Sequence, residues 1–270
     1  MISFPNCKIN LGLSITGRFP DGYHRIETVI YPVPLCDMLE IVPAAGNSNR
    51  ISVSGIPVAG NAEDNLCFKA WNLLNQEFNI GNIDLHLHKN IPSGAGLGGG
   101  SGDAAFTLKL LDNIYGLKLG DKNLERLAAQ LGMDCPFFIE NLPALATGRG
   151  ESTEPVDICL DGYYLAIIKP DIHISTAEAY AGVTPSEKPV PVRRLIQEPV
   201  DKWSRILHND FEPSVFNRHP EISDIKQRLY ASGAVYASMS GSGSAVFGIF
   251  TDPSDVKDCF PGCFVWQGLL

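Results

Sequence analysis

The segment over residues 92–102 carries the strongest chemical signal in the sequence, because it reads Pro-Ser-Gly-Ala-Gly-Leu-Gly-Gly-Gly-Ser-Gly. Glycine lets consecutive backbone N–H groups turn toward one point, and it lets a ligand approach the backbone without a Cβ atom in the way. Such N–H groups bind phosphate when a helix N-terminus follows them. A tight turn or a flexible linker is the alternative, but five glycines in seven residues cost a turn too much conformational entropy. The segment therefore predicts a phosphate-binding loop.

Three common phosphate-binding motifs do not describe this loop. Gly94, Gly96 and Gly99 satisfy the spacing of a dinucleotide-binding fingerprint, but no second strand ending in Asp or Glu follows about twenty residues later. A P-loop needs Gly-Lys-Ser or Gly-Lys-Thr, and a protein kinase needs His-Arg-Asp and Asp-Phe-Gly. The sequence contains neither the P-loop motif nor the protein-kinase motifs, so the loop is predicted to hold phosphate in another way.

The composition narrows the class of protein. The chain has 270 residues, of which 44% are apolar and 19% charged, and its net charge is −9. A chain of this kind buries a large core, which excludes a mainly disordered protein. The acidic balance disfavours broad nucleic-acid binding, and no stretch approaches the roughly 18 apolar residues of a membrane-spanning helix. Seven cysteines without CxxC spacing and a start without a signal peptide predict reduced thiols in a cytoplasmic protein.

The hydrophobic pattern predicts the elements that must position the glycine loop. Alternation of apolar and polar residues predicts a strand over 83–88, directly before the loop. Apolar residues at helical spacing predict a helix that starts near Ser101, directly after it. A further helix is expected, with Asp121 as its N-cap and Gly132 just past its end. The loop is thus predicted to join a strand to a helix N-terminus.

Other elements indicate the fold class. An earlier helix is expected to begin at Asp64 or Asn65, and residues 185–199 are predicted to form a long, mobile, proline-rich connection. Strands are predicted over 163–168, 234–239 and 245–250, and the last two flank a second glycine loop at 240–244. Strands and helices mix without strict alternation, so the pattern favours an α+β fold over a doubly wound sheet. We expect two domains, over 1–155 and 156–270.

Several segments resemble known kinases. The glycine loop resembles the ATP loop of the GHMP kinase superfamily, the relatives of galactokinase, homoserine kinase, mevalonate kinase and phosphomevalonate kinase, and residues 239–243 resemble its third motif. Residues 5–11, 17–24 and 132–138 narrow the resemblance to the 4-diphosphocytidyl-2-C-methyl-D-erythritol kinase family. The motif Asp-Gly-Tyr-His at 21–24 is the discriminating one, since the glycine loop alone only indicates the superfamily. The resemblance spans nearly the whole chain.

This resemblance implies an activity and an architecture. It implies a two-domain α+β kinase with mixed sheets and helices and an active site in the cleft between the domains. The enzyme would phosphorylate the 2-hydroxyl of 4-diphosphocytidyl-2-C-methyl-D-erythritol, in the non-mevalonate route to isoprenoid precursors. ATP would be its co-substrate, with Mg²⁺ expected, and neither nucleic acid nor membrane would be a partner. Monomer and homodimer both stay open.

The resemblance also implies two catalytic residues. Asp134 would accept the proton of the acceptor hydroxyl or orient it, and Lys8 would polarise that hydroxyl or stabilise the transferring phosphoryl group. From composition alone, an Asp two residues before Pro136 is more often a helix cap, and a lysine near a chain start is usually solvated. The apolar residues around Lys8 disfavour the second alternative.

The remaining predicted site residues bind the two substrates. The nucleotide would contact Pro92, Ser93, Gly94, Ala95, Gly96, Leu97, Gly98, Gly99, Gly100, Ser101, Gly102 and Asn65. The cytidylated acceptor would contact Asn10, Tyr23, His24, Thr176, Tyr180, Gly241 and Ser242. In this assignment His24 hydrogen-bonds the base edge, Tyr180 stacks on cytosine beside Thr176, and Asn10 lies near the reacting hydroxyl. The alternatives are that Tyr23 packs in a turn, Tyr180 lies in the core and Asn65 is an N-cap.

Two positions depart from the family pattern. Cys7 stands where a small residue such as alanine is usual, and Gly102 stands where a second serine commonly follows Ser101. The second change removes one hydroxyl donor to phosphate or metal, while the backbone N–H of Gly102 remains. The loop should still bind ATP, and the metal ligands stay unassigned.

Two other groups of residues have simpler explanations. His86 and His88 lie two apart on one strand face, a spacing found in zinc sites, but no third ligand accompanies them and a polar strand face explains them better. The basic clusters 193–194 and 202–205 are interpreted as solvated. A nicotinamide oxidoreductase, a non-catalytic nucleotide-binding regulator and another GHMP-type kinase remain the alternative functions.

Overall fold

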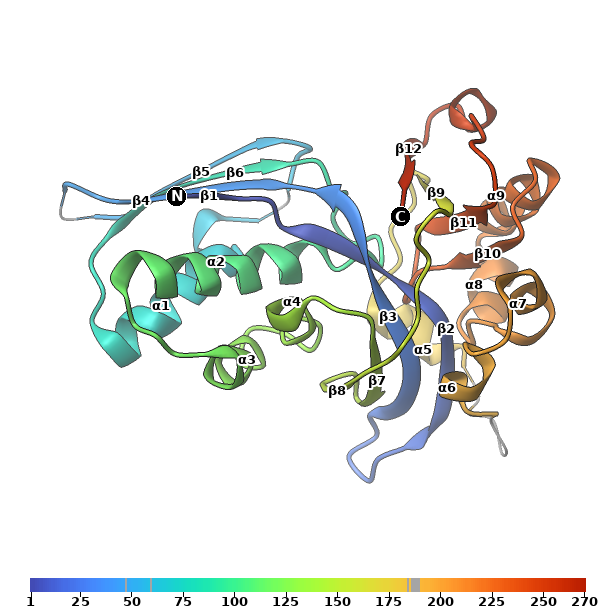
Figure 1. Cartoon of the computed structure of the whole chain (residues 1–270), viewed down its shortest axis with the longest axis horizontal. Coiled ribbons are helices and arrows are strands. Elements are labelled where there is room, and N and C mark those ends of the chain that lie inside the picture. The colour runs from blue at the N-terminus through green and yellow to red at the C-terminus, as the bar shows by residue number, and fades with distance from the viewer. Residues whose placement is uncertain (47, 59, 184, 186–189) are drawn as a thin grey trace. The chain divides into compact units, whose positions relative to one another are not determined.

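The structure is a computed structural model that describes residues 1–46, 48–58, 60–183, 185 and 190–270 (Figure 1). The chain forms two compact units, and both are discontinuous in sequence. The first unit comprises Met1–Cys7, Leu35–Ser93 and Gly98–Leu142. The second unit comprises Lys8–Pro34, Gly94–Leu97 and Pro143–Leu270. The expected domains, 1–155 and 156–270, are instead continuous in sequence, and that division stays a prediction.

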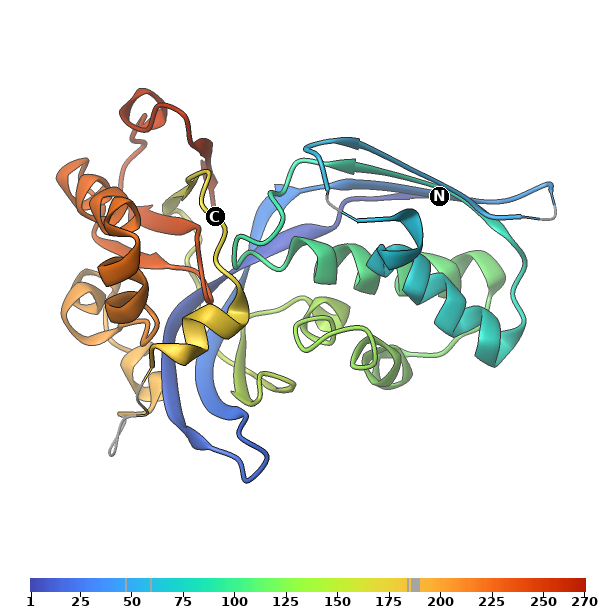
Figure 2. The same ribbon diagram turned by 180° about the vertical axis from the view of Figure 1, so that it is seen from behind.

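The first unit is a four-stranded sheet with helices on one face. Its strands lie in the order β1 (Ile2–Ser3), β4 (Met38–Pro43), β6 (Ile83–Lys89) and β5 (Arg50–Gly55). β6 is antiparallel to β4 and parallel to β5, which makes the sheet mixed. Helices α1 (Leu66–Phe78) and α2 (Gly99–Tyr115) run beneath the sheet in Figure 1, and the reverse view in Figure 2 shows the same layering. The alternating burial of β6 explains this arrangement, because its apolar side chains face the helices.

The helices of this unit test the predicted caps. The 3-10 turn Ala62–Asp64 leads to α1, and Asn65 is the N-cap of this helix. The Asn65 side chain accepts a hydrogen bond from the Cys67 N–H at 2.8 Å, so the alternative that Asn65 is an N-cap is confirmed. The helix expected near Ser101 begins two residues earlier, at Gly99. The prediction for Asp121 was wrong, because the N-cap of α3 (Asp121–Ala128) is Gly120 and Asp121 is the first helical residue. The helix ends at Ala128, and turns carry the chain on to α4 (Phe137–Glu140).

The second unit contains the other two sheets. One has the order β2 (Asn6–Arg18), β3 (His24–Cys36), β7 (Ala144–Gly148) and β8 (Ser152–Pro155), and the first residues of β2 and the last of β3 belong to the first unit. The other has the order β10 (Tyr236–Met239), β11 (Val246–Phe250), β9 (Tyr164–Lys169) and β12 (Phe264–Leu269), with every neighbouring pair antiparallel. The predicted strands at 163–168, 234–239 and 245–250 are confirmed, and so is the α+β class.

Helices complete the second unit. They are α5 (Thr176–Ala181), α6 (Val192–Leu195), α7 (Val200–Ile206), α8 (Glu212–Arg218) and α9 (Pro220–Ala231), with a 3-10 turn over Lys257–Cys259. The connection predicted over 185–199 is wrong in part, because α6 lies within it, and residues 186–189 lie outside the described chain. In the described residues, no helix is long and apolar enough to cross a membrane.

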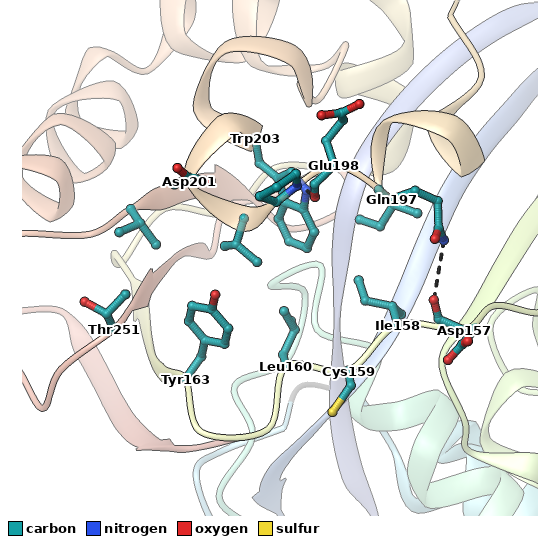
Figure 3. Close-up of a pocket in the computed structure, with 14 residues that line it drawn as sticks. Asp157, Ile158, Cys159, Leu160, Tyr163, Gln197, Glu198, Asp201, Trp203 and Thr251 are labelled. Atoms are coloured by element: carbon teal, nitrogen blue, oxygen red, sulfur yellow. Dashed lines mark hydrogen bonds between the residues drawn. The ribbon is translucent and has the colours of Figure 1, made fainter.

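A cavity of about 350 Å³ opens between α7 and the segment that leads into β9 (Figure 3). Its lining includes Cys159, Leu160, Tyr163, Trp203 and Thr251. Thr251 follows the end of β11, whereas the glycine loop at 240–244 precedes the start of that strand. None of the predicted site residues lines this cavity.

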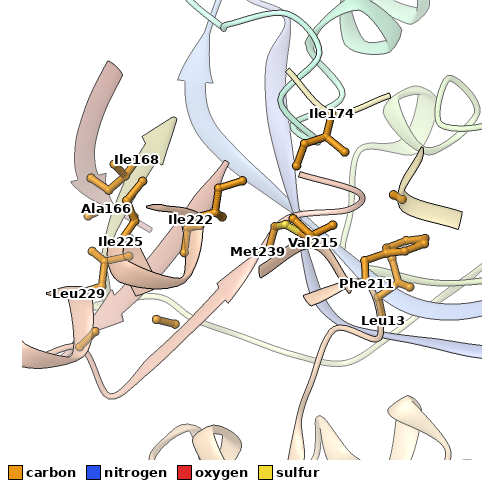
Figure 4. Close-up of a cluster of buried hydrophobic side chains, with 14 of the residues drawn as sticks. Leu13, Ala166, Ile168, Ile174, Phe211, Val215, Ile222, Ile225, Leu229 and Met239 are labelled. Atoms are coloured by element: carbon orange, nitrogen blue, oxygen red, sulfur yellow. The ribbon is translucent and has the colours of Figure 1, made fainter. Parts of the chain in front are cut away.

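A cluster of buried apolar side chains lies within the second unit (Figure 4). α9 contributes Ile222, Ile225 and Leu229, which pack against β10 and β11. Met239 and Phe211 extend the cluster toward the start of the second glycine loop. Close packing of this kind gives the loop a rigid base on which polar groups can be placed accurately.

Candidate active site

The glycine loop has the geometry of a phosphate site. It leaves β6 and enters α2, whose N-cap is Gly98 with φ of 70°. Gly94 and Gly96 also have positive φ, at 63° and 76°, in the region that favours glycine. The first turn of α2 has no acidic side chain, so the positive end of the helix dipole is not neutralised by its own residues. An anion at this helix N-terminus is therefore stabilised.

The second glycine loop holds part of the first within the second unit. A Cβ atom on Gly96 would lie 1.9 Å from the carbonyl oxygen of Ser240, so glycine is required at this contact. The Ser240 hydroxyl donates to the Gly96 carbonyl at 2.8 Å, and the Ala245 N–H donates to the Ala95 carbonyl at 3.1 Å. The motif at 239–243 therefore has a structural role, because it fixes the path of residues 94–97.

The loop at 240–244 is itself anchored by Asn209 and Glu212, which the sequence analysis did not identify. The Asn209 amide donates to the carbonyls of Met239 and Gly241, both at 2.8 Å. One oxygen of Glu212 accepts from the Met239 N–H at 2.9 Å, and the other accepts from the Lys226 ammonium at 2.6 Å. A buried side chain that bonds distant backbone leaves no periodic pattern in the sequence.

Lys8 and Asn10 lie together on β2, next to the two glycine loops. The Lys8 N–H donates to the Leu97 carbonyl at 2.9 Å, so β2 is attached to the first glycine loop. The Lys8 ammonium donates to Asn10 Oδ1 at 2.6 Å, and both side chains are buried. The alternative of a solvated Lys8 is therefore wrong, because the residue is only 3% exposed.

Asp134 lies in a tight turn of the first unit. The Cys135 N–H donates to the Gly132 carbonyl at 3.2 Å, and α4 follows with Pro136 at its N-cap position. Asp134 is therefore not the N-cap of α4, which removes the capping alternative. Burial raises the pKa of the neighbouring Cys135 thiol to about 11, so this thiol is protonated and is not a competing nucleophile.

His24 and Tyr180 form a stacked pair within the second unit. Their ring centroids are 4.7 Å apart with an interplanar angle of 20°, and the Tyr180 ring also meets Phe211 edge to face at 4.8 Å. Tyr180 thus packs against the core, as its alternative predicted, and contacts His24 as well. Burial, aided by the charge of Arg18, lowers the pKa of His24 and favours the neutral imidazole. His24 Nε2 is buried and has no hydrogen-bond partner among the described residues.

Tyr23 is 58% exposed at the tip of the β2–β3 hairpin. Arg149 lies over its ring, 4.6 Å from the centroid, and forms an ion pair with Asp21. Asp21 also accepts from the Tyr23 N–H at 3.2 Å. Arg149 was not predicted from the sequence, because a single arginine in a turn between β7 and β8 forms no recognisable pattern. Its guanidinium covers one face of the Tyr23 ring.

The remaining predicted residues have defined local roles. Thr176 is the first residue of α5, where Ser175 is the N-cap and accepts from the Glu178 N–H at 3.1 Å. His86 and His88 hydrogen-bond Ser54 on β5, at 3.1 and 2.9 Å, which supports the polar strand face. The described residues contain no group of three or more His, Cys, Asp or Glu side chains suited to a metal ion. All seven cysteines are free thiols.

The departure at Gly102 has a steric explanation. Gly102 lies in the first turns of α2, and a Cβ atom there would lie 2.8 Å from the Asn6 carbonyl oxygen. The next residue, Asp103, binds the Lys89 ammonium at 2.6 Å, and Asp37 binds the same ammonium. A serine at position 102 would therefore crowd the backbone of β2. One oxygen of Asp103 is thus engaged inside the first unit, and the other is buried without a hydrogen-bond partner among the described residues.

The chain is similar to known proteins in sequence and in structure. The GHMP kinases N terminal domain matches residues 65–141, and the GHMP kinases C terminal domain matches residues 194–260. The 4-diphosphocytidyl-2-C-methyl-D-erythritol kinase of Parabacteroides distasonis is 51% identical over 272 residues, covering 100% of each chain. The kinase of the same name from Bacteroides thetaiotaomicron is 54% identical over 252 residues, covering 93% of this chain and 92% of its own. A crystal structure of 4-(cytidine 5'-diphospho)-2C-methyl-D-erythritol kinase superposes with a TM-score of 0.85, at 31% identity over 99% of this chain and 98% of that chain.

Proposed function

Because the chain belongs to the 4-diphosphocytidyl-2-C-methyl-D-erythritol kinase family of the GHMP kinases, we propose that it transfers the terminal phosphoryl group of ATP to the 2-hydroxyl of that cytidylated alcohol. The observation that carries the proposal is the identity of about half of the aligned residues with two relatives of that name, over 100% and 92% of their lengths. The products are ADP and the 2-phosphate, and the reaction serves the non-mevalonate route to isoprenoid precursors in the cytoplasm.

ATP binds through the first glycine loop in this proposal. The N–H groups at the start of α2 and the helix dipole stabilise its phosphates, while the contact between Gly96 and Ser240 fixes the loop. Mg²⁺ arrives with ATP as the metal–nucleotide substrate, since Mg²⁺ keeps much of its water and is largely held by the phosphates. Asn65 already caps α1, so its contribution to the nucleotide is a second role.

Lys8 and Asp134 perform the chemistry in this proposal. Phosphoryl transfer places negative charge on the transferring oxygens and requires an oriented acceptor hydroxyl. The Lys8 ammonium stabilises that charge, and Asp134 orients the hydroxyl and receives its proton. Asn10, Gly241 and Ser242 bind the methylerythritol end of the acceptor.

The cytidine end binds at the pair of His24 and Tyr180. The unsatisfied Nε2 of His24 supports a hydrogen bond to the base edge, because a buried imidazole nitrogen without a partner costs free energy until a ligand supplies one. Tyr23 and Thr176 complete this part of the site in the proposal, and Arg149 holds the Tyr23 ring through its stack and its ion pair with Asp21. The acceptor is thus selected by its base as well as by its hydroxyl.

An acceptor panel tests the proposal. ADP release from ATP and Mg²⁺ is measured with the cytidylated methylerythritol, homoserine, mevalonate and galactose, and turnover is expected with the first alone. Turnover with another acceptor would retain the phosphate loop and overturn the substrate assignment. ATP binding without turnover on any acceptor would indicate a nucleotide-binding regulator. Asp134→Asn should abolish turnover in a protein that still folds, with the surface variant Asp121→Asn as its control.

A further inference from the structure

We propose that Thr28 is a positioning residue for phosphoryl transfer, because its hydroxyl fixes the amide of Asn10 and that amide holds the ammonium of Lys8. The inference rests on the proposed function, in which Lys8 acts on the transferring phosphoryl group. Lys8 and Asn10 lie on β2, and Thr28 lies on β3. Their exposed fractions are 3%, 4% and 1%, so water does not compete for these hydrogen bonds.

Three hydrogen bonds run in series through these side chains. The Thr28 hydroxyl donates to the Gly12 carbonyl at 2.5 Å. Asn10 Nδ2 donates to Thr28 Oγ1 at 3.1 Å. The Lys8 ammonium donates to Asn10 Oδ1 at 2.6 Å. The series therefore begins at a backbone carbonyl, whose position is fixed by the strand, and ends at the ammonium.

The direction of the series follows from the number of protons. A threonine hydroxyl has one proton, and Thr28 gives it to Gly12, so toward Asn10 the hydroxyl oxygen acts as an acceptor. Asn10 must then present its NH₂ group to Thr28 and its oxygen to Lys8. The reversed amide would place NH₂ against an ammonium, which has three donors and no acceptor. Thr28 thus selects the amide orientation that Lys8 needs.

Ser240 does not set this orientation. Its hydroxyl lies 3.4 Å from Asn10 Oδ1, which is long for an O–H···O bond, and 2.8 Å from the Gly96 carbonyl. Because the hydroxyl has one proton, the shorter contact takes it. The contact that fixes the NH₂ end of Asn10 is therefore the one to Thr28, and the second N–H of the amide is compatible with binding the acceptor.

Two substitutions at one position separate this role from simple packing. Thr28→Val keeps the shape and removes the hydroxyl, whereas Thr28→Ser keeps the hydroxyl and removes a methyl group. We expect Thr28→Val to lower kcat about tenfold, the size of one lost buried hydrogen bond. KM for ATP should change less than about twofold, whereas KM for the acceptor should rise, because Asn10 also binds the acceptor in the proposed function. Thr28→Ser should keep nearly the wild-type kcat.

A lower kcat for Thr28→Ser than for Thr28→Val would overturn the proposal. If Thr28 serves packing, Thr28→Ser is the more damaging change and Thr28→Val is benign. If Thr28→Val does not fold, Thr28→Ala and Thr28→Ser supply the same test, since both lose the methyl group and they differ by the hydroxyl. Equal kcat in that second pair would also contradict the role.

A crystal structure of the substrate-free Thr28→Val protein gives a readout that does not depend on activity. The proposal expects a rotated Asn10 amide or a displacement of Lys8 Nζ by about 1 Å, a shift large enough to impair catalysis. An unmoved ammonium, still bonded to Asn10 Oδ1, would overturn it. Because this measurement needs no substrate, it decides the role of Thr28 even if the acceptor panel shows that the proposed reaction is wrong.

Discussion

Two buried lysines lie in different surroundings in the two units of this molecule. Lys89, in the first unit, and Lys8, in the second, are each 3% exposed. Lys89 contacts the carboxylates of Asp37 and Asp103, whereas Lys8 donates to the amide of Asn10. Lys89 is held by two carboxylates from other segments of its unit, whereas the amide that Lys8 contacts lies two residues away on the same strand. Because its two carboxylates join separate segments of the first unit, Lys89 has a structural role, whereas the role proposed for Lys8 is to stabilise the transferring phosphoryl group.

The structural role of Lys89 follows from where its partners lie. Lys89 is the last residue of β6, just before the glycine loop, and Asp103 lies in α2, just after it. Burial alone would lower the pKa of Lys89, but Asp103 and Asp37 outweigh it and raise the pKa, so the lysine stays charged. Asp37 also accepts from the N–H groups of Asn90 and Ile91, at 2.6 and 2.8 Å. The charged cluster of Lys89, Asp37 and Asp103 thus connects the segments before and after the first glycine loop within the first unit.

The largest effect is expected for stability when Lys89 is removed. Lys89→Met leaves two buried carboxylates without their shared cation, and breaking a buried pair in this way costs about 3–5 kcal/mol. Urea unfolding should show this loss, and the exposed Lys122→Met should show none as its control. A Lys89→Met protein as stable as the wild type would mean that the cluster does not support the fold.

The second effect is expected for catalysis when Lys8 is removed. Lys8→Met should lower kcat about 10²–10³-fold, the usual size for loss of one group that stabilises transition-state charge. The melting temperature of Lys89→Met should fall more, because the two buried carboxylates of Asp37 and Asp103 lose their shared cation. Steady-state kinetics and thermal unfolding of both variants check this contrast. Similar losses of activity and stability in the two variants would remove the distinction between the lysines.

The pH dependence of stability tests the charged cluster more finely. Burial, opposed by the nearby Lys89, raises the pKa of Asp103 from 3.8 to about 7. Between these values the folded protein binds more protons than the unfolded chain, so the free energy of unfolding falls as pH rises through that window. Asp103→Asn lacks this group, so wild type should lose stability relative to the variant from pH 4 to pH 7. Urea unfolding at several pH values measures the difference, and a constant or opposite difference would contradict the raised pKa.

The smallest effect is expected for the stability of a Gly102 variant. Gly102 precedes Asp103 and packs against the backbone of Asn6, two residues before Lys8. Gly102→Ser restores the serine usual in the family, yet its Cβ would lie 2.8 Å from the Asn6 carbonyl. Overpacking of this kind costs about 1–3 kcal/mol. Gly100→Ser is the matched control, because its Cβ would lie 3.7 Å from Leu66 Cδ1, an ordinary contact. Equal stability of the two variants would show that β2 moves aside without cost.

The sequence predicted the elements around the phosphate loop well, since these depend on local patterns. Alternation over 83–88, helical spacing after Ser101 and the glycine run each reflect short-range geometry, and β6, the loop and α2 follow in that order. The boundaries were less accurate. Gly120 with φ of 72° replaced Asp121 as the N-cap of α3, because the chain turns there through a conformation that a periodicity argument does not consider.

The sequence did not predict the residues that support the site, because they act through contacts between distant segments. Asp37 and Lys89 are 52 residues apart, and Asn209 reaches the carbonyl of Gly241 across 32 residues. A single polar residue in an apolar strand carries no sign of its partner. Lys8 was identified through the resemblance of its motif to a family, and its link to Thr28 appears when β2 and β3 are placed side by side.

Phosphorylation of a hydroxyl of the cytidylated methylerythritol can be observed by ³¹P NMR of the products. With ATP, Mg²⁺ and this acceptor, we expect one new phosphomonoester signal on the acceptor for each ADP formed, with its diphosphate signals retained. ADP accompanied by inorganic phosphate alone would show hydrolysis of ATP and would contradict a kinase reaction on this acceptor, as would a mixture in which ATP is never consumed.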